Sequence, residues 1–109
     1  MAISYKVLAQ SAPSATTNTD IYTVGAGKEA VVSTITVANR SATARTYRIA
    51  IRPAGATLAN QHYVAYDVSI GANDTTALTL GITLTSTDVV TVYASTTDLS
   101  FGIFGSEIS

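Results

Sequence analysis

Few side chains in this sequence could catalyse a reaction or bind a metal ion, and their spacing forms no familiar site. His62 is the single histidine and cysteine is absent, so the common zinc-binding spacings cannot be assembled. His62 also has no nucleophile partner that the sequence makes evident. We therefore expect a solvated or locally hydrogen-bonded loop histidine, with no catalytic residue, no metal site and no cofactor.

The acidic residues and the glycines are explained by turns. Four aspartates each stand just before a predicted strand, where Asp favours turns: Asp20, Asp74, Asp88 and Asp98. Gly25-Ala-Gly27 lies between two predicted strands with no helix after it, so it lacks the amide donors of a phosphate-binding loop. The stretch from Asn73 to Thr76 supplies too few oxygen ligands for a calcium loop. The sequence thus predicts a protein that is not an enzyme.

One concentration of charge stands out, formed by Arg40, Arg45, Arg48 and Arg52. Arg48 and Arg52 share one face of a predicted strand, whereas Arg45 has the opposite parity or lies at a bend. These arginines could pair with Asp67 and other acids across the sheet, or they could dock another protein. Nucleic-acid binding is the weakest interpretation, because a net charge of −1 does not fit such a role. We treat the four arginines as candidate interface residues.

Tyrosines offer a different kind of chemistry. Their rings could stack on sugars, but tyrosine is also common in strands and at protein interfaces. The tyrosines considered are Tyr22, Tyr47, Tyr63, Tyr66 and Tyr93. Because the chain has no tryptophan, a carbohydrate platform ranks below ordinary packing.

The overall composition indicates association with other proteins. The 109 residues suit one domain, and only 12% of them are charged, against roughly 25% in ordinary soluble domains. A net charge near zero promotes association. The surface is either kept soluble by threonine and serine or covered in an assembly, and we favour the second interpretation.

Apolar residues recur at every second position through most of the chain, which is the signature of half-buried β-strands. No segment keeps a helical period. The expected strands alternate with turn residues at intervals of roughly 10 residues, which indicates a sandwich or barrel. They are 20–24, 29–39, 45–52, 64–70, 78–84, 89–94 and 99–104. We predict an all-β fold, a single-domain antiparallel β-sandwich over residues 20–109, with jelly-roll and immunoglobulin-like strand orders both open.

Residues 1–19 are predicted to form an N-terminal strand followed by an extended arm. Ile3, Tyr5 and Val7 alternate in a short strand, and the stretch from Gln10 to Thr19 has small residues and no period. Such an arm could add as a strand to a neighbour's sheet. Ile3, Tyr5 and Val7 are therefore also candidate interface residues.

The sequence carries no pattern for export or membrane insertion. The first eight residues lack a long apolar stretch, and no run approaches the ~20 apolar residues of a membrane span. We expect a protein made in the cytoplasm, with no cleaved leader and no membrane partner.

Several phrases of the sequence resemble small virion structural proteins of tailed bacteriophages. The resemblance covers most of the chain from about Ile21 onward. It is carried by Ile21-Tyr-Thr-Val-Gly-Ala-Gly27, Val31-Val-Ser-Thr-Ile-Thr-Val-Ala-Asn-Arg40, Tyr47-Arg-Ile-Ala-Ile-Arg-Pro-Ala-Gly55, Asn60-Gln-His-Tyr63 through Asn73-Asp-Thr-Thr76, and Leu80-Gly-Ile-Thr-Leu84.

This resemblance implies a β-sandwich on a phage particle and assigns no role to any single residue. A cement (decoration) protein of the capsid is the first expectation, and such proteins often form trimers at symmetry axes. A tail, baseplate or fibre component is the alternative. The implied partner is the major capsid protein or a tail protein, the implied assembly a homo-oligomer, and the implied location the virion.

Overall fold

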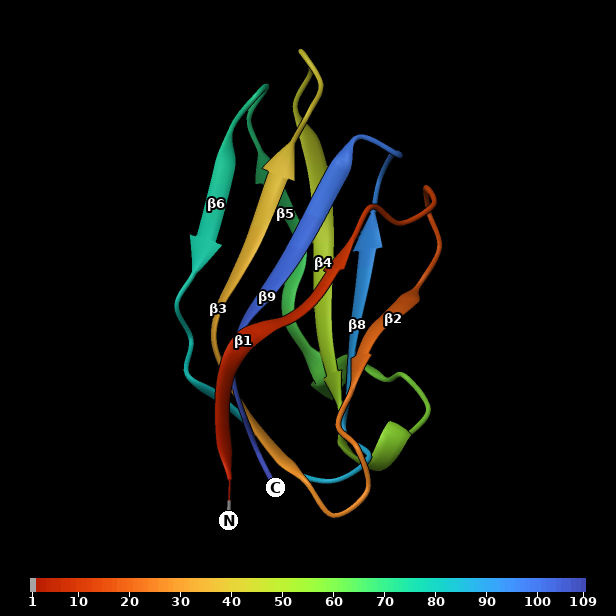
Figure 1. Ribbon diagram of the computed structural model, residues 1–109. Coiled ribbons are helices and arrows are strands. Elements are labelled where there is room, and N and C mark those ends of the chain that lie inside the picture. The colour runs from red at the N-terminus through yellow and green to blue at the C-terminus, as the bar shows by residue number, and fades with distance from the viewer. Residues whose placement is uncertain (1) are drawn as a thin grey trace.

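Two antiparallel β-sheets pack face to face, which confirms the predicted all-β sandwich (Figure 1). The computed structural model describes residues 2–109. Sheet A contains β1 (Ile3–Ser11), β9 (Leu99–Ile108), β3 (Glu29–Asn39), β6 (Thr75–Leu78) and β7 (Ile82–Leu84). Sheet B contains β2 (Thr19–Thr23), β8 (Val89–Ala94), β4 (Arg45–Arg52) and β5 (Tyr63–Ile70). The connection from β4 to β5 holds two single 3₁₀ turns, η1 (Pro53–Gly55) and η2 (Asn60–His62).

The order of strand pairing identifies the sandwich as a jelly roll. Strands from the first half of the chain pair with strands from the second half in nested order: β1 with β9, β2 with β8, β3 with β6 and β7, and β4 with β5. This order results when one long hairpin of the whole chain is rolled up, so that successive pairs fall alternately into the two sheets. Of the two strand orders that the sequence leaves open, the chain therefore adopts the jelly roll.

The core lies between the sheets and is filled by buried residues of β3, β4, β5, β7, β8 and β9, against which partly buried residues of β1, β2 and β6 pack. The largest fully buried side chains include Tyr47, Ile35, Ile49, Leu99 and Ile103. Each aliphatic side chain of this size contributes about 1.5–3 kcal/mol when it is fully buried. The alternation of residue types along the sequence thus reflects strands that turn one face toward this core.

Bulges at one level of sheet A change which residues face the core. β1 has one extra residue at Leu8, opposite the step from Ile103 to Phe104, and β3 has one extra residue at Ser33, opposite the step from Phe104 to Gly105. Val32 and Ile35 are consequently both buried although their parities differ. Unbroken alternation would place Val31 and Ile35 on one face of β3, but the bulge at Ser33 prevents this, because a bulge reverses the side-chain alternation beyond it.

The predicted strand over residues 78–84 is also wrong, since it is two strands. β6 ends at Leu78 opposite Ile35, and β7 begins at Ile82 opposite Val32. Three residues therefore stand opposite two on β3, and Gly81 absorbs the excess with a φ of 62°. A left-handed backbone of this kind is open to glycine at little steric cost.

The N-terminal segment belongs to the sandwich along most of its length. β1 runs to Ser11, beyond the expected short strand, and pairs with β9 along its length. Pro13 is buried, and Ala15 forms a bridge to Ala94 of β8. The predicted extended arm is therefore short, because the backbone of this stretch pairs with β9 and β8 of the same domain.

Candidate protein-interaction surfaces

All four arginines of the predicted cluster are bound within the chain. Arg48 lies 2.6 Å from the Asp67 carboxylate, Arg52 2.8 Å from Asp20, and Arg45 3.1 Å from Asp98. Arg40 instead donates to the Ser100 hydroxyl and to the Thr97 carbonyl oxygen. Except for Arg40, the arrangement matches the alternative in which these arginines pair with acids across the sheet. All four are poorly placed to donate to a partner protein.

Arg48 forms the centre of an aromatic stack on the outer face of sheet B. Its guanidinium lies 4.3 Å from the ring centroids of both Tyr66 and Tyr93, and Tyr63 meets Tyr66 edge-on at 4.9 Å. Cations in this position are attracted by the electron-rich ring faces. The hydrogen bond to Asp67 raises the pKa of Arg48 above its ordinary value, so the guanidinium stays charged.

A bulge in β5 makes this stack possible. Tyr47 pairs with Val68 and Ile49 pairs with Ala65, so Tyr66 and Asp67 both stand opposite Arg48. Asp67 adopts a φ of 50°. The sequence pattern places Tyr66 and Ile70 on one face, but Tyr66 is 56% exposed and Ile70 is buried.

Beside the stack, an open cleft of about 510 Å³ is lined by Asn60, Tyr63 and Tyr66. Asn60 offers an amide, and the two tyrosines offer rings and hydroxyls, which are groups that can hold a polar ligand such as a sugar. Arg48, however, already lies over the Tyr66 ring. One of the stacking surfaces that a sugar would use is therefore occupied.

A charged cluster joins the two sheets where β1, β9 and β2 approach each other. The Glu107 carboxylate accepts hydrogen bonds from Lys6 Nζ at 2.9 Å and from Tyr22 Oη at 2.7 Å, and Lys28 Nζ lies 3.9 Å away. The Lys6 contact, followed by the Tyr22 hydrogen bond, lowers the pKa of Glu107 below its ordinary value. Burial, reinforced by Glu107, raises the pKa of the Tyr22 hydroxyl.

Replacing Glu107 with glutamine is expected to lower thermal stability at neutral pH but not in acid. A carboxyl group whose pKa is lowered in the folded state stabilises that state above its unfolded pKa of about 4.3. This contribution is lost as the pH falls through the lower pKa of the folded state. Melting curves at pH 7 and at strongly acidic pH should show the difference from wild type shrinking on acidification, while E29Q, outside the cluster, provides the control. An equal difference at both pH values would contradict the assignment.

The strand residues predicted to lie at an interface are the most exposed apolar residues of sheet A. Tyr5 is 84% exposed, Val7 51% and Ile3 48%. All three lie on β1, which forms one edge of the sheet (Figure 1). Unlike the arginines, these residues are free to contact another molecule.

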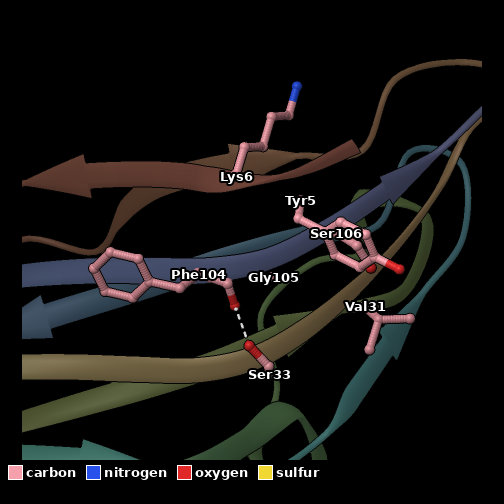
Figure 2. Close-up of a pocket in the computed structure, with 7 residues that line it drawn as sticks. All are labelled: Tyr5, Lys6, Val31, Ser33, Phe104, Gly105 and Ser106. Atoms are coloured by element: carbon pink, nitrogen blue, oxygen red, sulfur yellow. Dashed lines mark hydrogen bonds between the residues drawn. The ribbon is translucent and has the colours of Figure 1, made fainter. Parts of the chain in front are cut away.

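A hollow of about 350 Å³ opens next to Tyr5 on the outer face of sheet A (Figure 2). Its other lining residues are Lys6, Val31, Ser33, Phe104, Gly105 and Ser106. The Ser33 hydroxyl donates to the Phe104 carbonyl oxygen at 3.0 Å, which satisfies the polar group on its floor. Lys6 is the charged residue of this lining, and Glu107 neutralises it. We call this region, from β1 to β3, the outer A face.

Val31 and Phe104 of the outer A face are residues that sequence reasoning missed. Their strands have large residues on both parities, and only the bulge at Ser33 and the pairing with β9 decide which parity faces out. The predicted strand 99–104 ends one residue before Gly105, whereas β9 continues to Ile108. Gly105 was the available signal, because a glycine within a strand often marks a close approach of backbones.

His62 is buried and its Nδ1 accepts a hydrogen bond from the Ala59 backbone N–H at 3.0 Å. Among residues 2–109, no three histidine, aspartate or glutamate side chains gather closely enough to hold a metal ion. The same residues contain no helix that is long and apolar enough to cross a membrane. Comparisons of the chain with protein-family models, with curated proteins and with solved structures gave no match.

Proposed function

We propose that this protein is a non-enzymatic structural component of a tailed-phage virion, a capsid cement protein that binds the major capsid protein through the outer A face. The observation that carries the proposal is the apolar surface of that face. It exposes Tyr5 and Val7 beside Val31 and Phe104, and its charged lining residue is neutralised internally. Contiguous apolar surface of this kind marks protein contact sites.

The fold supports a role in resisting mechanical stress. A cement protein has to bridge neighbouring subunits and resist outward stress, which calls for rigid sheets and a broad contact. Nested pairing ties the first strand to the last, and the start of β1 lies beside the end of β9 at one end of the sandwich (Figure 1). Jelly rolls occur in viral capsid and lectin domains, an analogy that rests on the fold alone.

A tail, baseplate or fibre component is the alternative within the same proposal, because such parts also assemble through broad sheet surfaces. Electron microscopy of antibody-labelled virions that carry this chain separates the two. Label on the head supports the cement role and label on the tail supports the alternative. Virions that take up no label at either place would contradict both.

Replacing Val31 with lysine is expected to weaken binding to the particle at least about tenfold, or about 1.4 kcal/mol. The substitution places a new charge in the lining of the outer A face, and Val31 lies on β3 rather than on the free edge. Binding of the purified variant to particles stripped of this protein would be measured beside V64K, which changes an exposed valine of sheet B in the same way. Melting temperatures should stay near wild type. Equal binding by V31K and V64K would contradict the use of this face.

A carbohydrate-binding role is the second candidate, favoured by the cleft between Asn60, Tyr63 and Tyr66. It ranks lower because Arg48 covers one of the rings. A screen of glycans against the purified protein tests it, with Y63A and Y66A as variants, and a clean negative screen removes it.

A further inference from the structure

Among the edge strands in the described part of the chain, β1 has the longest run without a register shift, and this run ends at the bulge at Leu8. The opposite edge of sheet A is broken between β6 and β7. In sheet B, β5 carries the bulge at Tyr66 and Asp67, and β2 shifts register between Asp20 and Tyr22. Natural proteins blunt exposed edges with such devices to prevent pairing with another chain. From Ile3 to Val7, β1 keeps its register.

Hydrogen bonding to β9 shows which residues of β1 point outward. Ala2 and Ser109 exchange both backbone hydrogen bonds, at 3.0 and 2.9 Å. In an antiparallel ladder such pairs alternate with pairs that exchange none, so Ser4 and Lys6 also turn their backbone groups toward β9. The N–H and C=O groups of Ile3, Tyr5 and Val7 therefore face the open edge.

We propose that two copies of this protein pair through β1, antiparallel, about a two-fold axis at Tyr5. In this register Tyr5 lies opposite Tyr5 of the second copy, and Ile3 lies opposite Val7. All three residues present outward backbone groups, so each pair exchanges two hydrogen bonds and the two A sheets become continuous. The axis falls at the centre of the segment Ile3–Val7, which keeps its register up to the bulge at Leu8.

The side chains and charges favour the same register. Ile3, Tyr5 and Val7 are the exposed apolar residues of β1, and pairing brings them into contact with each other across the axis, in line with the outer A face. Lys6 then lies opposite Ser4 and not opposite a second Lys6. Its ammonium group leaves the strand in a different direction from Tyr5 (Figure 2) and is bound to Glu107, so no like charges meet at the contact.

This pairing is a property of the purified chain and does not depend on the proposed function. It also differs from the trimer that the phage resemblance implies, because an edge that pairs with itself generates a two-fold axis. Sedimentation velocity over a range of concentrations distinguishes the two. We expect a reversible monomer–dimer equilibrium in which Y5P raises the dissociation constant at least tenfold. Proline at this position removes an outward N–H, as edge strands tolerate.

Cross-linking tests the register without disturbing the backbone. The chain has no cysteine, so Y5C introduces one thiol per copy. The Cα atoms of a hydrogen-bonded antiparallel pair are about 5.5 Å apart, within the range that a disulfide spans. Mild oxidation of Y5C should give a covalent dimer, while V64C, on the edge strand of sheet B, stays monomeric. A monomer at all concentrations, a trimer, a dimer indifferent to Y5P, or a Y5C protein that does not cross-link would each overturn the proposal.

Discussion

Replacing Gly105 with alanine is expected to reduce the free energy of unfolding by about 3 kcal/mol or more. A Cβ at this position would overlap the backbone carbonyl oxygen of Val31 and would lie 3.1 Å from the Ser33 nitrogen. The obstacle is the backbone of β3, which cannot rotate away as a side chain can. Overpacking costs about 1–3 kcal/mol, and each hydrogen bond lost between β9 and β3 adds about 0.5–1.5 kcal/mol. Such a loss is a large part of the ~5–15 kcal/mol that stabilises a typical domain.

Urea denaturation of G105A beside G71A provides the measurement and its matched control. A Cβ at Gly71 meets only the Asp74 side chain, at 3.8 Å or more, which is an ordinary contact. We expect G71A to unfold near the wild-type midpoint and G105A well below it. Similar midpoints for both variants would contradict this prediction. They would show that β9 and β3 can move apart at Gly105 with little loss of stability.

The sequence predicts strands well wherever the alternation runs without interruption. The bounds of β3, β4 and β8 agree with the predicted ranges 29–39, 45–52 and 89–94. In each of these segments the ends are marked by turn residues. Element positions are thus local information, set by side-chain period and by residues such as Pro53, which cannot donate to a ladder.

What the sequence could not supply is which face of a strand looks outward. A bulge is one extra residue in the pairing between two strands. Nothing in the residue types at Ser33 or Asp67 marks either residue as the extra one. Each bulge reverses the faces beyond it. For this reason Val31 and Phe104 were missed at the candidate site, whereas Ile3, Tyr5 and Val7 lie before the bulge of β1 and are all exposed.

Apart from Asp67, the partners of charged residues were predictable only as residue types. Acids across the sheet were expected for the arginines, and Asp67 was named as one of them. The two rings around Arg48 and the link from Tyr22 to Glu107 depend on pairing between distant strands. Nested pairing is a property of the whole chain, so no window of sequence reveals it, and the choice between jelly-roll and immunoglobulin-like order had to come from the structure.

Deleting residues 2–11 is expected to abolish cooperative folding or leave an aggregating remnant. The deletion removes the whole partner of β9 on one side, together with Leu8 and Ala9, which pack against the core. It also takes Lys6 from Glu107. The free energy of unfolding should fall by at least about 3 kcal/mol, since Leu8 and Ala9 lose their core contacts and each backbone hydrogen bond lost between β1 and β9 adds about 0.5–1.5 kcal/mol. The exposed edge of β9 would then pair between molecules. A dispensable arm, in contrast, would leave the melting temperature unchanged.

Circular dichroism and light scattering of the truncated chain measure this loss, and a synthetic peptide spanning residues 2–13 tests its cause. If β1 acts as a strand of sheet A, the peptide should add to the vacant edge of β9 and restore folding, as in strand complementation between chains. A peptide of the same composition in scrambled order is the control, because it cannot place Leu8 and Ala9 against the core. A truncated protein that melts like wild type would contradict the structural role of β1 and return the N-terminal segment to the status of an arm. It would also contradict the proposed pairing at Tyr5, because β1 can pair with a second copy only while its hydrogen bonds to β9 keep it extended.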